Sequence, residues 1–190
     1  GAENANIRIG DTVVVFAQGP IGLCATAGAR LLGATTIIAV DGNDHRLGIA
    51  QKMGADVTLN FKNCDVIDEI MKITGGRGAD SAIEALGTQA TFESALRSIK
   101  PGGTLSSLGV YSEDLKIPLS AFAAGLGDHK INTALCPGGK ERMRRLMNVL
   151  ASNRLDLGLL VTHQYKLDDI VAAYDLFAHQ RDGVLKVAIK

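Results

Sequence analysis

The sequence predicts an α/β protein built on a doubly wound sheet of six parallel strands. Short apolar runs rich in β-branched residues recur along the chain, stretches with helical character separate them, and Gly or Pro marks the junctions. Alternating strands and helices are typical of parallel sheets, in which strands that are apolar throughout are buried on both faces. With 190 residues, the chain is long enough for one sizeable core.

Six segments have the length and composition of buried strands. Val, Ile and Thr are frequent in several of them, which favours strands over buried helices. The predicted strands are Thr12–Ala17, Thr36–Val40, Val57–Phe61, Ser81–Leu86, Gly103–Val110 and Ile131–Cys136.

Predicted helices separate these strands. Segments 20–33 and 44–54 each end at a glycine, a residue that commonly closes a helix, and segments 66–74 and 89–99 precede the turn signals GGRG and PGG. Further on, two sets of apolar residues have helical spacing and predict buried helical faces. They are Met143, Leu146, Met147 and Leu150, then Leu167, Ile170, Tyr174 and Phe177. The region after Asn153 reads as a strand, a helix and a last strand, which need not join the same sheet.

Composition limits the functions to consider. Twenty basic and 20 acidic residues give a formal charge of zero, so nothing in the bulk charge favours nucleic acid or an anionic membrane. No apolar run approaches a membrane span, and the first residues do not resemble a signal peptide. The three cysteines are widely separated, which favours reduced thiols over disulfides or a zinc knot. We therefore expect a cytoplasmic protein.

The loop after the first strand is the main candidate site, because ligands of such sheets bind beyond the carboxyl ends of the strands. Gly19 lets a phosphate approach the backbone, Pro20 suits the first helical position, and Ile21 and Gly22 offer N–H groups at the positive end of the helix dipole. The full motif G-x-G-x-x-G is incomplete, since Ala17 holds its first position. A tight turn without a ligand is the alternative interpretation.

The end of the second strand favours a nucleotide. Asp41 lies about twenty residues beyond the loop, where a carboxylate can accept hydrogen bonds from the hydroxyls of an adenosine ribose. The same charge would repel a 2′-phosphate, so Asp41 favours NAD over NADP. Strand, loop, helix, strand and acid together predict a Rossmann dinucleotide site.

At this point the sequence resembles the medium-chain, zinc-dependent alcohol dehydrogenases, especially their secondary-alcohol branch. The similarity extends over nearly the whole chain, in GAENANIRIGDTVVV, GPIGL, KMGAD, KPGGTL, HKINTALCPGGKERM and LVTHQY. It implies hydride transfer between NAD and a secondary alcohol or similar small carbonyl compound. It also implies a homodimer or homotetramer.

The resemblance implies roles for individual residues. Gly19 to Gly22 match the pyrophosphate turn, and Asp41 matches the ribose position. NADP-using relatives have Ser and Arg after that position, whereas this sequence has Gly42 and Asn43. Asn43 is therefore kept among the candidate cofactor-binding residues. The others are Ala85, Leu86 and Gly87 beside the adenosine, Leu108, Gly109, Val110, Ala134, Leu135 and Cys136 near the nicotinamide, and Lys186 against the pyrophosphate.

The family's catalytic zinc has ligands in a domain that precedes the cofactor domain, and no segment of this sequence matches their pattern. We expect no catalytic or metal-binding residue here, zinc only in the missing catalytic domain, and an inactive isolated chain. Residues 1–154 are predicted to form the dinucleotide-binding domain, and 155–190 a C-terminal segment that in relatives completes the catalytic domain. Three alternatives stay open: a non-catalytic NAD-sensing module, a zinc-independent quinone reductase, and a methyltransferase with a similar glycine loop.

Overall fold

A computed structural model describes residues 1–190 and confirms the predicted six-stranded parallel sheet. The strand order is β3-β2-β1-β4-β5-β6, so the chain reverses direction across the sheet between β1 and β4. The chain divides into two compact units, residues 1–138 and 139–190. The sequence placed a domain boundary later, after residue 154, and that assignment of domains stays a prediction.

The sheet belongs to the first unit, and its strands lie close to the predicted segments. They are β1 (Thr12–Phe16), β2 (Thr36–Asp41), β3 (Val57–Asn60), β4 (Ala79–Glu84), β5 (Ile99–Ser107) and β6 (Lys130–Thr133). β6 ends earlier than expected because its partner β5 ends at Ser107, which pairs with Thr133. Residues 134–136 therefore have no partner strand and form a loop.

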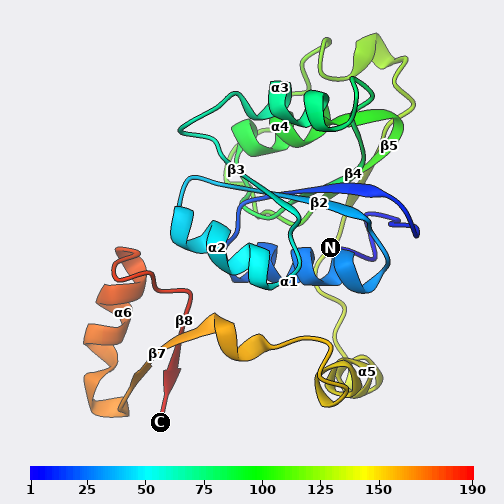
Figure 1. Cartoon of the computed structure of the whole chain (residues 1–190). Coiled ribbons are helices and arrows are strands. Elements are labelled where there is room, and N and C mark those ends of the chain that lie inside the picture. The colour runs from blue at the N-terminus through cyan, green and yellow to red at the C-terminus, as the bar shows by residue number, and fades with distance from the viewer. The chain divides into compact units, whose positions relative to one another are not determined.

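Helices cover both faces of the sheet. In Figure 1, α1 (Pro20–Leu31) and α2 (Asp44–Lys52) lie on one side of it, and α3 (Val66–Ile73) and α4 (Gln89–Ser98) lie on the other. Successive strand side chains point to opposite faces, so each central strand serves both layers. Val14 and Phe16 of β1 join the core cluster that includes Phe92 of α4. The short helix η1 (Ala123–Gly125) lies between β5 and β6.

The second unit contains a separate small sheet, as the sequence allowed. Its strands β7 (Val161–Tyr165) and β8 (Lys186–Ile189) pair in parallel. The remaining elements are α5 (Lys140–Ala151), η2 (Leu157–Leu160), η3 (Leu167–Asp169) and α6 (Ile170–Ala178). None of the helices in the chain is long and apolar enough to cross a membrane.

The predicted buried faces of the last two helices are wrong for this chain. Met143, Leu146 and Met147 of α5 are exposed, and so are Tyr174 and Phe177 of α6. In this unit only Leu160, Ala173, Val184 and Leu185 are buried hydrophobic residues. A core this small cannot bury the apolar faces of two helices. The helical spacing therefore predicted the apolar faces of α5 and α6 correctly, but the unit leaves these faces exposed.

Candidate functional site

The turn between β1 and α1 leaves space where an anion would bind. Gly19 precedes the helix with φ −70° and ψ −177°, and a methyl group on its Cα would meet no atom within 4 Å. Pro20 has no N–H, and the first intrahelical hydrogen bond is donated by the Leu23 N–H to the Gly19 oxygen at 2.9 Å. The N–H groups of Ile21 and Gly22 lie in the first turn, where the helix offers them no acceptor. The turn therefore has the geometry and polarity of a phosphate site.

Gly22 is required by the shape of this turn. A Cβ at Gly22 would lie 1.8 Å from the carbonyl oxygen of Ala17 and 2.9 Å from its carbonyl carbon. Both are backbone atoms, which cannot move aside as a flexible side chain could. The start of α1 thus lies directly against the end of β1.

Ala17 adopts a backbone conformation that favours glycine. Its φ is +69°, in the left-handed region, and its N–H donates to the Val40 oxygen at 2.9 Å. The alanine thus takes the conformation expected of the missing first motif glycine, and its Cβ makes that conformation costly.

Replacing Ala17 by glycine is expected to stabilise the chain by about 0.5–1 kcal/mol, because the relief of left-handed strain exceeds the added flexibility of the unfolded chain. Urea denaturation of the two proteins would measure this difference. The control is Ala90→Gly in α4, an exposed helical position with the opposite expected sign, a loss of about 1 kcal/mol. A less stable Ala17→Gly protein would contradict the expectation.

Gln18 holds the turn from inside and was missed by the sequence analysis. Its side chain is fully buried, donates from Nε2 to the Val15 oxygen at 2.9 Å, and accepts at Oε1 from the Thr26 hydroxyl at 3.0 Å. Its backbone N–H donates to Oδ2 of Asp41 at 2.6 Å. A polar residue between an apolar strand and the glycine turn was the available signal, but its partners could not be identified from the sequence.

Asp41 is the last residue of β2 and lies at the carboxyl edge beside the turn. Its carboxylate accepts from the Gln18 N–H through Oδ2 and from the Asn43 N–H through Oδ1 at 2.9 Å. These two hydrogen bonds fix the carboxylate, which is only 8% exposed. Asn43 caps α2, because its side-chain oxygen accepts from the His45 N–H at 2.9 Å. The structure thus shows a helix-capping role for the Asn43 side chain, and its cofactor contact stays a prediction.

The loops that follow β4 and β5 touch each other. A Cβ at Gly109 would lie 2.2 Å from Cα of Gly87, so glycine is needed at this crossing. Leu86 and Val110 flank the contact, and both side chains are exposed. The remaining predicted residues of these loops are Ala85 and Leu108.

The loop after β6 carries Ala134, Leu135 and Cys136, all exposed. Exposed side chains of Val110 (83%) and Leu135 (87%) give the carboxyl edge an apolar character. Lys186 lies on β8 and belongs to the second unit.

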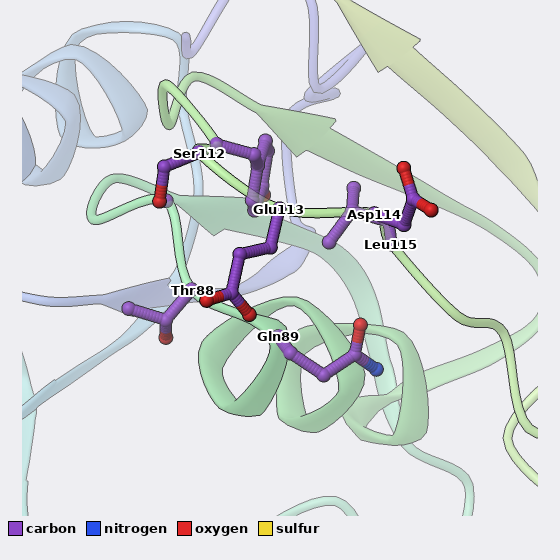
Figure 2. A pocket seen from close by; sticks show the side chains of 8 residues that line it. Thr88, Gln89, Ser112, Glu113, Asp114 and Leu115 are labelled. Carbon is purple, nitrogen blue, oxygen red and sulfur yellow. The ribbon is translucent and has the colours of Figure 1, made fainter.

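A pocket of about 240 Å³ opens beside the contact between the β4 and β5 loops, lined by residues 87–89 and 111–115. Figure 2 shows the Glu113 side chain reaching toward Thr88 at the start of α4. Thr88 is the N-cap of this helix, and its hydroxyl accepts from the Thr91 N–H at 3.2 Å. A carboxylate of the chain itself thus lies near the positive end of α4, which disfavours binding of a second phosphate there.

The structure contains no group of three or more His, Cys, Asp or Glu side chains that could hold a metal ion. The residues present therefore do not fit a zinc site. Gly19 faces open space at the start of α1, and the Asp41 carboxylate lies beside it at the same edge of the sheet.

The strand order of the sheet and the glycine turn together define an α/β protein of the Rossmann type. A model of the zinc-binding dehydrogenase family matches residues 20–152, and this chain belongs to that family.

Individual relatives are alcohol dehydrogenases by name. The chain is 85% identical over 190 residues to an alcohol dehydrogenase of Cupriavidus necator, covering 100% of this chain and 52% of that protein. It is 36% identical to the NADP-dependent isopropanol dehydrogenase of Thermoanaerobacter brockii, covering 100% of this chain and 54% of that protein. Among solved structures, zinc dependent alcohol dehydrogenase 2 from Streptococcus pneumoniae matches with a TM-score of 0.92 and 31% identity, over 100% of this chain and 54% of that one. The chain spans about half the length of these relatives.

Proposed function

We propose that this chain binds NAD(H) and forms the cofactor-binding part of an oxidoreductase that transfers hydride between NAD and a secondary alcohol or similar small carbonyl compound. The observation that carries the proposal is the turn at Gly19, which opens onto free space and lies beside the fixed carboxylate of Asp41. Family membership and the names of the relatives support the class of reaction.

In this proposal the N–H groups of Ile21 and Gly22 bind the pyrophosphate, and the Asp41 carboxylate accepts from the adenosine ribose. The loop at 85–87 lies beside the adenosine half, and the loops at 108–110 and 134–136 beside the nicotinamide. The resemblance also assigns Lys186, on β8 of the second unit, to the pyrophosphate, and that assignment stays a prediction. The bound nicotinamide supplies the hydride chemistry, and the chain's residues hold and orient it.

The substrate and the zinc belong to the part of the enzyme outside this chain. No residue here is assigned a catalytic role. The exposed edge strand β6 supports a homodimer or homotetramer as part of the same proposal, because pairing would satisfy its free edge.

Calorimetric titration of the chain with NADH, and separately with NADPH, tests the proposal. We expect NADH to bind and NADPH to bind more weakly, because the Asp41 carboxylate repels a 2′-phosphate. The matched variant is Gly19→Asp. Its backbone angles suit aspartate and its Cβ enters open space, so the fold is expected to survive. Its carboxylate would occupy the anion site, and NADH affinity is expected to fall at least about tenfold.

Absence of NADH binding by the folded wild-type chain would overturn the proposal. Equal NADH binding by the wild-type chain and Gly19→Asp would place the ligand elsewhere. Heat on titration with S-adenosylmethionine but not with NADH would favour the methyltransferase alternative.

A further inference from the structure

Glu84 is a fully buried carboxylate at the end of β4. Its Oε1 accepts from the N–H groups of Leu86 at 2.8 Å and Gly87 at 2.7 Å, and from the Thr91 hydroxyl at 2.7 Å. These three donors are neutral, and they tie the carboxylate to the loop after β4 and to the first turn of α4. A buried carboxylate is costly unless such donors surround it, so this arrangement determines the local structure.

The other oxygen of Glu84 is used by the loop after β5. The hydroxyl of Tyr111 donates to Oε2 at 2.7 Å and lies 2.6 Å from the hydroxyl of Ser107. Burial raises the pKa of Tyr111, with the adjacent Glu84 acting in the same direction, so the phenol keeps its proton. The Tyr111 hydroxyl donates its hydrogen bond to Glu84, so the Ser107 hydroxyl donates to the Tyr111 oxygen. The three side chains thus form one hydrogen-bonded series that runs from Ser107 through Tyr111 to Glu84.

The hydrogen bonds from Ser107 through Tyr111 to Glu84 join two loops whose backbones are already in contact. The Leu108 N–H donates to the backbone oxygen of Glu84 at 2.8 Å. A Cβ at Gly87 would lie 2.6 Å from the Val110 oxygen, and one at Gly109 would lie 2.6 Å from Oε2 of Glu84. The position of residues 108–110 relative to 85–87 therefore depends on the Glu84 carboxylate and on Tyr111.

We propose that Tyr111 and Glu84 are positioning residues for the cofactor, and that their hydrogen bond holds residues 108–110 in the arrangement that receives the nicotinamide half. The inference rests on the proposed NAD(H) binding. It adds two residues that contact no cofactor atom themselves and act through the loops they hold.

The ring of Tyr111 and its hydroxyl can be separated experimentally. The ring packs edge-on against Phe92, with centroids 6.1 Å apart and planes at 87°. Phenylalanine at position 111 would keep this packing and remove only the hydroxyl. The packing role of the Tyr111 ring would therefore survive in Tyr111→Phe, whereas the positioning role of its hydroxyl would not.

The test compares NADH with ADP-ribose, which lacks the nicotinamide, by calorimetry on the wild-type chain and Tyr111→Phe. We expect NADH to bind about five- to tenfold more weakly to the variant, with ADP-ribose affinity unchanged within about twofold. The matched control is Tyr174→Phe, at an exposed position in the second unit, and it should leave both affinities unchanged.

A second variant guards against failed folding. Glu84→Gln keeps a side-chain oxygen for the two amides and the Thr91 hydroxyl, and its NH₂ group can donate to Tyr111, which then donates to Ser107. Because the hydrogen bond between positions 84 and 111 is kept, we expect this variant to lose less NADH affinity than Tyr111→Phe, and a loss as large as that of Tyr111→Phe would contradict the inference. Urea denaturation of each variant confirms that the protein titrated is folded.

Three further outcomes would overturn the inference alone: unchanged NADH affinity in Tyr111→Phe, equal loss of NADH and ADP-ribose affinity, or a wild-type chain that binds both ligands equally. In the last case residues 108–110 contribute nothing to binding. A folded wild-type chain that binds neither ligand would overturn the proposed function as well.

Discussion

Replacing Gly22 by alanine is expected to lower the free energy of unfolding by about 3 kcal/mol and to abolish NADH binding. The added methyl carbon would lie 1.8 Å from the Ala17 oxygen, far inside any van der Waals contact. The obstructing atoms are backbone, so either the end of β1 or the start of α1 has to move. Either movement displaces the N–H groups proposed to bind the pyrophosphate. Urea denaturation and NADH calorimetry measure the two effects.

Gly48→Ala is the matched control. Gly48 lies inside α2, and a Cβ there would meet no atom within 4 Å. The same chemical change at this position should therefore stabilise the chain by about 0.5–1 kcal/mol, because alanine favours a helix. If Gly22→Ala kept full stability and NADH affinity, the close contact described for the turn would be wrong.

Replacing Asp41 by asparagine is expected to shift cofactor preference toward NADPH by about tenfold to a hundredfold, measured as the ratio of the two dissociation constants. The wild-type carboxylate is fixed by the N–H groups of Gln18 and Asn43 at the edge where the ribose is proposed to lie. Asparagine keeps the shape and removes the charge that opposes a 2′-phosphate. The asparagine NH₂ group would face one of the two backbone N–H groups, which then has no acceptor. The substitution is therefore also expected to lower the free energy of unfolding by about 1–3 kcal/mol.

Asp44→Asn is the control, since it changes net charge equally and lies three positions along the chain, at the exposed start of α2. Its carboxylate accepts from the Asn60 side chain at 2.6 Å. We expect its cofactor ratio to change by less than about twofold, because exposed charges are screened. An Asp41→Asn protein that is folded and keeps the wild-type ratio would show that Asp41 does not select the cofactor.

The parts of the candidate site that could be predicted from the sequence are local ones. The glycine turn, the helix that starts at Pro20 and the acid that ends β2 all follow from neighbouring residues or from one strand–helix–strand unit. The hydrogen bonds that hold the site are not local. Gln18 meets Asp41 across 23 residues, and Glu84 meets Tyr111 across 27, so neither pair has a spacing that a sequence pattern could reveal.

The helical faces of α5 and α6 illustrate a different limit. Periodicity shows that one side of a helix is apolar, but it contains no information about which surface covers that side. Tyr174 has the spacing of a buried residue and is 71% exposed. The end of β6 was misjudged for a related reason, because a strand ends where its partner ends, and Ser107 of β5 sets that limit.

The strand order also determines how the chain can fold. Every pair in the six-stranded sheet is parallel, so no pair can form as a simple hairpin between neighbouring segments. The central pairing of β1 with β4, which aligns Val13 with Ser81, brings together segments separated by β2, β3 and three helices. Closing this long loop costs conformational entropy, and the chain loses that entropy before its middle strands make their contacts. The architecture that places the carboxyl ends of all six strands at one edge therefore gives a high contact order and slow folding.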